Sequence, residues 1–364
     1  MTEWKEYKLG EVIKTNVESI GKDYPYSKIL YLDTGSITRN NIDQYQEFEL
    51  DKAPSRAKRL VKQDDIIYSS VRPNQLHYGY ITNPANNLVV STGFVTITCN
   101  KAYIEPKFLY YYLTQENITE YLHSVAEAST SAYPSLKASD IESLYIELPP
   151  LPEQICIASI LSSLDDKIDL LHRENKTLEA MAETLFRQWF IEEAKEDWEE
   201  GKLGDMIEIK YGKDHKKLED GKIPVIGSGG IMRYANTSLY DKQSVLIPRK
   251  GSLNNVMYIN KPFWTVDTMF YTKMLKPNTA KFVYHFMKGL DLANMNVGSA
   301  VPSMTTEVLN NIPIDIPTQD VFDKFENHVS NLYRKIENNQ NQIQTLIQQR
   351  DSLLPKLMSG EVKI

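Results

Sequence analysis

The segment WKEYKLGEVI at residues 4–13 returns as WEEGKLGDMI at residues 198–207. A second match follows in the same order, because KFLYYYL at 107–113 is answered by KFVYHFM at 281–287. One short match arises easily by chance, but several matches in sequence indicate a duplicated unit. The chain is therefore interpreted as two copies of one structural unit, the second of which has fewer residues.

Each copy ends in an apolar strand bounded by prolines, after which the hydrophobic period changes from 2 to 3.5 residues. Seam residues step by four and three from Ile157 to Trp189, and again from Phe325 to Leu357. This spacing predicts two coiled-coil helices. A helix over 157–189 would be about 50 Å long, which is too long to be packed around one small domain.

Each seam contains one asparagine away from its centre, Asn175 in the first and Asn339 in the second. Antiparallel pairing of the two helices with matched midpoints places these residues side by side. A buried asparagine fixes the register of a coiled coil, since any slip leaves its amide unpaired. The alternative is that each asparagine faces water where the helices splay.

The remaining sequence is rich in short β-type runs separated by Asn, Pro and Gly turns. One helix is expected near 106–122 and its counterpart near 278–290. The expected fold class is α+β: two globular domains with pseudo-two-fold symmetry, separated by two long antiparallel coiled-coil helices. The predicted segments are a first domain at 1–150, a first helix at 151–197, a second domain at 198–317 and a second helix at 318–364.

The composition is that of an ordinary globular protein of 364 residues with a net charge of −7. This net charge argues against a simple nucleic-acid binder, but residues 201–317 carry 15 basic and 10 acidic side chains. No basic and apolar leader and no apolar run near 20 residues is found, so a cytoplasmic protein without membrane spans is expected. Cys99 and Cys156 are expected to be free thiols, and the six scattered histidines predict no metal site.

The helical segments resemble a known family. LPPLPEQICIASILSSLDDKIDLLHRENKTLEAMAETLFRQWF at 148–190 closely resembles the central conserved region of type I restriction-modification specificity subunits, and RDSLLPKLMSGEV at 350–362 resembles their distal one. The resemblance covers the order of domains and helices along the whole chain. One departure is IPTQDVFDKF, which opens the second helix in place of a second LPPLPEQ.

The resemblance implies a DNA specificity subunit without catalysis of its own. Each domain would be a target recognition domain that contacts one half of a split, asymmetric site on double-stranded DNA, and the coiled coil would fix the gap between the halves. Two methyltransferase subunits would dock on the chain and bring S-adenosylmethionine, so no cofactor is expected here. Motor-nuclease subunits would complete the restriction complex.

Candidate DNA contacts are chosen by chemistry, because phosphate contact needs cations and base recognition needs Arg, Lys, Asn, Gln, Ser or Thr. In the first domain they are Lys52, Arg56, Lys58, Arg59, Lys62, Arg72, Asn74, Gln75 and Ser131 of SAYPSL. In the second they are Lys213, His215, Lys216, Lys217, Arg249, Lys250, Asn254 and Ser299 of SAVPSM. The loop with Arg249 is the repeat counterpart of the loop with Arg72. The alternative interpretation is that the charge runs are solvated surface and the serine segments are tight turns.

Enzyme signatures are missing from the sequence. It has no methyltransferase cofactor loop, no Asn/Asp-Pro-Pro-aromatic motif and no complete P-loop. A nuclease could use Asp205, Glu208 and Lys210, but such spacing is common and the first copy lacks it. Two alternatives remain: a DNA-binding coiled-coil protein of structural or regulatory function without restriction partners, and a self-contained methylating or cleaving enzyme.

Overall fold

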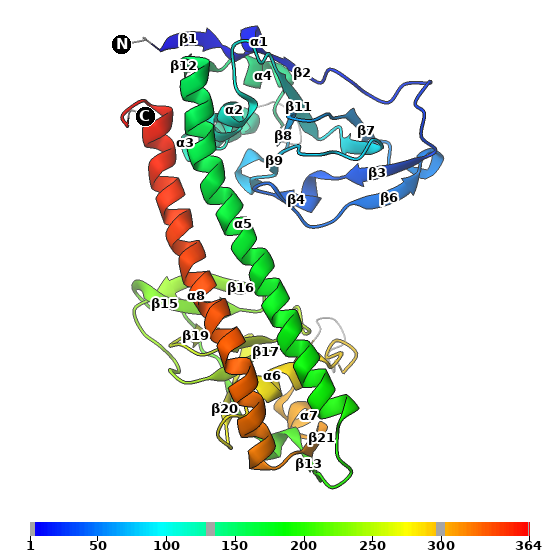
Figure 1. The fold of residues 1–364 in the computed structure, drawn as a ribbon, viewed down its shortest axis with the longest axis vertical. Coiled ribbons are helices and arrows are strands. Elements are labelled where there is room, and N and C mark those ends of the chain that lie inside the picture. The colour runs from blue at the N-terminus through cyan, green and yellow to red at the C-terminus, as the bar shows by residue number, and fades with distance from the viewer. Residues whose placement is uncertain (1–3, 129–134, 296–302, 363) are drawn as a thin grey trace. The chain divides into compact units, whose positions relative to one another are not determined.

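The chain forms two compact units, each of which contains one globular domain with parts of both long helices (Figure 1). Unit 1 comprises residues 1–170 and 342–364, and unit 2 comprises residues 171–341. The structure is a computed structural model, and the residues that it describes are 4–128, 135–295, 303–362 and 364.

The domain of unit 1 contains two four-stranded sheets, in the orders β6-β3-β10-β7 and β2-β11-β8-β9. Two small antiparallel pairs, β1-β12 and β4-β5, complete it. The strands are β1 (Lys5–Lys8), β2 (Ile13–Thr15), β3 (Lys28–Leu32), β4 (Ile37–Thr38), β5 (Asn41–Ile42), β6 (Gln46–Glu49), β7 (Ala57–Leu60), β8 (Ile66–Ser69), β9 (Tyr78–Tyr80), β10 (Leu88–Ser91), β11 (Phe94–Cys99) and β12 (Tyr145–Leu148). The short helices are α1 (Leu9–Val12), α2 (Pro106–Leu113), α3 (Glu116–Glu127) and α4 (Ala138–Glu142).

The domain of unit 2 repeats this plan with fewer strands. Its sheets have the orders β14-β20-β17-β18 and β16-β15-β19, and β13 pairs with β21. The strands are β13 (Glu199–Lys202), β14 (Ile207–Tyr211), β15 (Asp220–Gly227), β16 (Gly230–Ala235), β17 (Ser244–Pro248), β18 (Met257–Ile259), β19 (Trp264–Thr265), β20 (Met269–Met274) and β21 (Pro313–Ile316). The short helices are α6 (Ala280–Lys288) and α7 (Thr306–Asn310).

The two domains share one topology. In each, one sheet contains a parallel pair: β10 with β3 in the β6-β3-β10-β7 sheet of unit 1, and β19 with β15 in the β16-β15-β19 sheet of unit 2. The repeated glycine of the opening motif has a packing role, since a Cβ on Gly10 would lie 3.3 Å from Glu142 and one on Gly204 would lie 3.2 Å from Asn310. The duplication inferred from sequence is therefore a duplication of structure.

The long helices are α5 (Leu151–Arg187) and α8 (Gln319–Met358). Within unit 2 they run antiparallel, because Phe186 packs on Phe325 while Glu174 pairs with Lys335. Within unit 1, Asp165 of α5 pairs with Arg350 of α8, so the two helices are in contact there as well. Every predicted seam position is buried or half-buried, which confirms the heptad pattern. The last one, Trp189, lies in the π-helical turn Gln188–Glu192 that follows α5.

The single helix predicted near 106–122 is two helices, α2 and α3. The chain leaves the α conformation at Gln115, whose ψ of 144° is extended. The counterpart near 278–290 is one helix, α6. In the described part of the chain, no helix is both long and apolar enough to cross a bilayer.

Gln154, in the first turn of α5, anchors this helix to the domain of unit 1. The side chain is 1% exposed, accepts a hydrogen bond from the backbone N–H of Glu105 at 2.9 Å and donates to the carbonyl oxygens of Tyr103 and Pro149. All the hydrogen-bonding groups of this buried amide are near a partner, so its burial is compensated.

Candidate nucleic-acid interface

The first group of predicted cations lies on or beside the edge strand β7. Lys52 ends the 3₁₀ turn Leu50–Lys52, Arg56 lies in the next turn, Lys58 is on β7 and Lys62 follows it. All four side chains are exposed, and only Lys62 has an ion pair within the described residues, a 3.9 Å contact with Glu18. The charges of Lys52, Arg56 and Lys58 therefore face solvent without an ion pair among the described residues.

Arg59, also on β7, differs from these four because it is half-buried. Its Nε is buried and has no hydrogen-bond partner among the described residues, and burial lowers the pKa of the guanidinium. An unpaired buried donor costs about 1–3 kcal/mol. An acceptor supplied from outside the chain would remove that cost.

The outer edge of β7 is covered by a preceding segment. The N–H of Ile20 donates to the carbonyl of Lys58 at 2.8 Å, and the N–H of Leu60 donates to the carbonyl of Glu18. Because these backbone groups are already paired, only side chains of β7 are available to a ligand.

Arg72 holds an unusual backbone conformation in the loop after β8. Its φ is +48°, in the left-handed region, and it precedes the 3₁₀ turn Pro73–Gln75. A non-glycine residue there costs about 1–2 kcal/mol. Arg72, Asn74 and Gln75 are all exposed. Strain of this kind concentrates at functional positions, which favours a role for Arg72 beyond packing.

The corresponding loop of unit 2 can be matched to the Arg72 loop residue by residue, because both loops accept an equivalent backbone hydrogen bond. Leu136 N–H donates to the Ser70 carbonyl at 2.7 Å, and Met304 N–H donates to the Arg249 carbonyl at 2.9 Å. Ser70 is therefore the counterpart of Arg249, and the counterpart of Arg72 is Gly251, whose φ is +86°. The two loops are equivalent as the repeat predicts, but their arginines occupy different positions.

Arg249 and Asn254 are held within unit 2. The Arg249 guanidinium lies over the Tyr211 ring at 5.3 Å and donates to the Asp267 carbonyl at 3.3 Å. Asn254 donates to Asp291 and accepts from the N–H of Ala293, so its amide already stabilises a turn. Lys250, in contrast, is exposed.

The loop with Lys213, His215, Lys216 and Lys217 joins β14 to β15. Trp264 donates from Nε1 to the Lys213 carbonyl at 2.9 Å. The three lysine side chains are exposed, whereas His215 is half-buried and its Nδ1 has no hydrogen-bond partner in the part of the chain that the structure describes. The backbone of the loop is thus fixed while its cations remain in solvent.

In unit 1 the structure brings the two groups of predicted residues together at one turn. Thr92 N–H donates to the Arg56 carbonyl, and Ser70 N–H donates to the Gly93 carbonyl, both at 2.8 Å. The β7 cations and the Arg72 loop therefore flank the β10–β11 turn. Phosphate and base contacts could be made from such a surface.

The equivalent turn of unit 2, between β19 and β20, is also flanked by two segments: the Arg249 loop, which is the counterpart of the Arg72 loop, and the β14–β15 loop, which takes the place of the β7 cations. Lys213 N–H donates to the Thr265 carbonyl at 2.9 Å, and Arg249 N–H donates to the Thr268 carbonyl at 2.8 Å. The lysine loop and the Arg249 loop therefore meet there. We call the surface around the β10–β11 turn, formed by the β7 cations and the Arg72 loop, the turn surface of unit 1. The surface around the β19–β20 turn, formed by the lysine loop and the Arg249 loop, is the turn surface of unit 2.

Arg39 was not predicted from sequence. It forms the two-residue turn of the β4–β5 hairpin with Asn40, both residues having positive φ, and its N–H donates to the Leu76 carbonyl at 2.8 Å. The exposed Arg39 therefore adjoins the Arg72 loop. The only sequence signal is an Arg-Asn pair at a hairpin turn.

Two predicted residues, Ser131 and Ser299, lie outside the described residues. The carboxylates considered for a nuclease are engaged locally: Glu208 pairs with Lys210 at 2.6 Å, which lowers the pKa of Glu208, and Asp205 accepts from the Lys202 N–H. In the described ranges, no group of three or more His, Cys, Asp or Glu side chains is arranged for a metal ion.

Comparison with known proteins agrees with the repeated architecture. The specificity subunit of the type I restriction enzyme HindI from Haemophilus influenzae is 33% identical over 192 residues, which is 53% of this chain and 42% of that protein. This chain therefore spans less than half the length of that relative. The MjaIX specificity subunit from Methanocaldococcus jannaschii is 25% identical over 100% of this chain and 97% of its own length.

A solved structure has the same fold. The S subunit of a type I restriction-modification system from M. genitalium matches with a TM-score of 0.61 at 19% identity, over 98% of this chain and 96% of its own. The family described as the type I restriction modification DNA specificity domain matches residues 1–180 and 195–349. The chain thus belongs to the family of type I restriction-modification specificity subunits and has two recognition domains.

Proposed function

We propose that this chain reads a bipartite DNA target, each domain contacting one half-site through its turn surface, and that it performs no catalysis itself. The observation that carries the proposal is that equivalent turns in the two units gather different cations: Arg56 and Arg72 in unit 1, Lys213 and Arg249 in unit 2. One topology with different side chains suits one protein that recognises two unlike half-sites.

The partners in this proposal are two methyltransferase subunits, which bring S-adenosylmethionine, and motor-nuclease subunits that join them. In support, the relatives are specificity subunits of type I restriction enzymes. The test is to purify the full chain with the candidate methyltransferase and to sequence methylated adenines in the host genome. We expect a stable complex and one split, asymmetric methylated sequence. A chain that never binds a methyltransferase, or that methylates or cleaves DNA alone, would contradict the proposal.

The paired helices are proposed to set the gap between half-sites. One heptad inserted at matched positions in α5 and α8 adds about 10 Å, close to three base pairs at about 3.4 Å each. The gap in the methylated sequence should lengthen while both half-sites stay the same. A changed half-site with an unchanged gap would contradict this role for the helices.

A further inference from the structure

A pocket of about 360 Å³ lies in unit 1 between the start of α2 and the first turns of α5. The domain contributes Lys101, Lys107 and Tyr80 to its wall, and α5 contributes Ala158 and Ser159. None of these residues belongs to the turn surface of unit 1, so the proposed DNA contacts leave the pocket unexplained.

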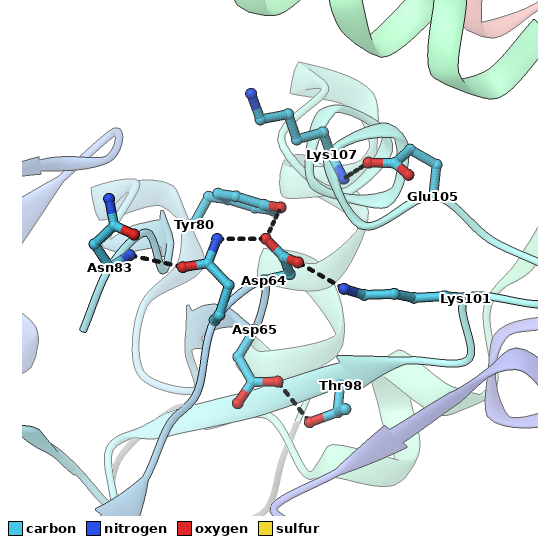
Figure 2. Close-up of polar contacts among 9 residues, drawn as sticks. Asp64, Asp65, Tyr80, Asn83, Thr98, Lys101, Glu105 and Lys107 are labelled. Atoms are coloured by element: carbon cyan, nitrogen blue, oxygen red, sulfur yellow. Dashed lines mark hydrogen bonds and ion pairs between the residues drawn. The ribbon is translucent and has the colours of Figure 1, made fainter. Parts of the chain in front are cut away.

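The polar groups on one side of the pocket are already paired, as Figure 2 shows. Asp64 accepts hydrogen bonds from Tyr80 Oη and Gln63 Nε2 and forms a 2.6 Å ion pair with Lys101. These contacts lower the pKa of Asp64 even though burial opposes the shift. The Asp64 and Lys101 charges therefore compensate each other.

Lys107 is the cation of the pocket that lacks a carboxylate partner. Its ammonium lies 6.0 Å from the centre of the Tyr80 ring, and no carboxylate of the described residues is within ion-pair distance of it. Glu105 contacts the backbone N–H of Lys107, while the lysine side chain extends away from that carboxylate (Figure 2).

Unit 2 has the same arrangement with the missing acid in place. Lys281, the counterpart of Lys107 in the repeated KF motif, is 3% exposed and forms an ion pair with Glu326 of α8. Its ammonium lies 5.6 Å from the Tyr258 ring centre. Tyr258 is the counterpart of Tyr80, since each pairs with the equivalent residue of the neighbouring strand, Val245 or Ile66.

The residue of α5 that corresponds to Glu326 is Ala158, 168 positions earlier in the repeated seam. Ala158 lines the pocket together with Lys107. Unit 1 therefore has the lysine and the tyrosine of this cluster but no carboxylate at the position of Glu326. The pocket lies between Ala158 and Lys107, where the carboxylate of a glutamate at position 158 would be.

We propose that this pocket receives a carboxylate side chain from the methyltransferase subunit, which pairs with Lys107 as Glu326 pairs with Lys281. This docking site rests on the proposed function. A single carboxylate fits the place and charge that the repeat defines, and Ser159 at the rim can donate a hydrogen bond to it. Ile155, 53% exposed on the same wall, offers the apolar contact typical of a protein interface.

A DNA strand fits the pocket less well. Asp64 and Glu105 also line it, and a strand would bring a row of phosphates against these two carboxylates, whereas a protein side chain brings one charge. Charge complementarity therefore favours a protein partner.

The test measures the affinity of the full-length chain for the purified methyltransferase subunit by titration calorimetry. We expect Lys107→Gln to weaken binding at least about tenfold, because a charge left unpaired in an interface costs more than about 1.4 kcal/mol. Lys107→Arg should stay within about threefold of wild type. Lys22→Gln, which removes an exposed lysine elsewhere in unit 1, is the matched control and should bind normally.

A second variant supplies the missing acid from within the chain. Ala158→Glu should pair with Lys107, close the pocket and weaken methyltransferase binding at least about tenfold, with no fall in thermal stability. Because this variant reproduces the arrangement of unit 2, it tests the proposal even if Lys107→Gln folds poorly.

The outcomes separate this proposal from the proposed function. If Lys107→Gln and Ala158→Glu bind the methyltransferase as wild type does, the pocket is not its docking site, while the proposed function stands. If Lys107→Gln binds the methyltransferase normally but loses affinity for DNA alone, the pocket is a DNA site and the proposal is overturned. If wild type binds no methyltransferase, both the function and the docking site are wrong.

Discussion

Asn339 donates a hydrogen bond from Nδ2 to Oδ1 of Asn175 at 2.9 Å, within the seam of unit 2, and the two residues are 1% and 8% exposed. Asn339 also donates to Glu174. Replacing Asn339 by Leu leaves the Asn175 amide buried without this donor, so the free energy of unfolding should fall by about 1–3 kcal/mol. Urea denaturation measures the change, and Asn338→Leu at the exposed neighbouring position is the control.

The double variant Asn175→Leu/Asn339→Leu tests whether the pair fixes the register, which is still a prediction. An all-apolar seam should recover or exceed the wild-type stability, but its helices should no longer prefer one register. Spin labels on α5 and α8 within unit 2 should then give several distances where wild type gives one. A single distance in the double variant would show that the asparagines do not specify the register.

Arg72→Gly should separate backbone strain from DNA binding. Glycine adopts the left-handed conformation without cost, as Gly251 does in unit 2, so stability should be unchanged or higher by up to about 1 kcal/mol. Affinity for a DNA duplex with the first half-site should fall by about 1–3 kcal/mol. Asn83→Gly, which has the same φ of +48°, is the backbone control and should bind DNA normally. Unchanged DNA affinity of Arg72→Gly would remove Arg72 from the interface.

The sequence predicted the duplication and both heptad seams because these depend on period alone, which needs no knowledge of tertiary contacts. It did not predict the break at Gln115, where periodic apolar residues continue through a local change of backbone conformation. The candidate cations were predicted by chemistry, but their meeting at the β10–β11 turn was not, since it depends on long-range hydrogen bonds of Arg56 and Ser70. The sequence also did not predict the left-handed φ of Arg72, because arginine, unlike glycine or asparagine, has no preference for that backbone region.

Gln154→Ala should loosen the junction between α5 and the domain of unit 1. The substitution leaves the N–H of Glu105 without its acceptor and the carbonyls of Tyr103 and Pro149 without their donor. The free energy of unfolding should fall by about 1–3 kcal/mol. Gln319→Ala in the first turn of α8 removes a half-buried amide and should cost less. Equal losses for the two variants, measured by urea denaturation, would contradict the anchoring role of Gln154.

We expect the stability of the chain to depend on pH through His285. Burial, with a smaller effect of Lys288, lowers the pKa of His285 from 6.5 to about 4, so the folded protein favours the neutral ring. Below pH 6.5 the unfolded chain binds a proton at this histidine more readily than the folded chain does, so the free energy of unfolding falls as the pH falls from 6.5 toward 4. At pH 5 the loss should be about 2 kcal/mol relative to neutral pH. His285→Gln should lose less stability than wild type between pH 7 and pH 5. Parallel stability curves over this range would contradict the prediction.

The ion pair between Lys281 and Glu326 should stabilise unit 2 only as a complete pair. The side chains are 4% and 15% exposed, so Glu326→Ala strands a buried cation and should cost about 3–5 kcal/mol. Lys281→Met/Glu326→Leu removes both charges and should regain most of that loss, because a buried ion pair is often replaceable by apolar side chains. Asp320→Ala, which removes an exposed pair with Lys324 on the same helix, should change stability by less than about 1 kcal/mol. A double variant as unstable as Glu326→Ala would contradict this prediction and would mean that the cluster needs both charges. Unit 1 would then tolerate alanine at position 158 only because Lys107 reaches solvent.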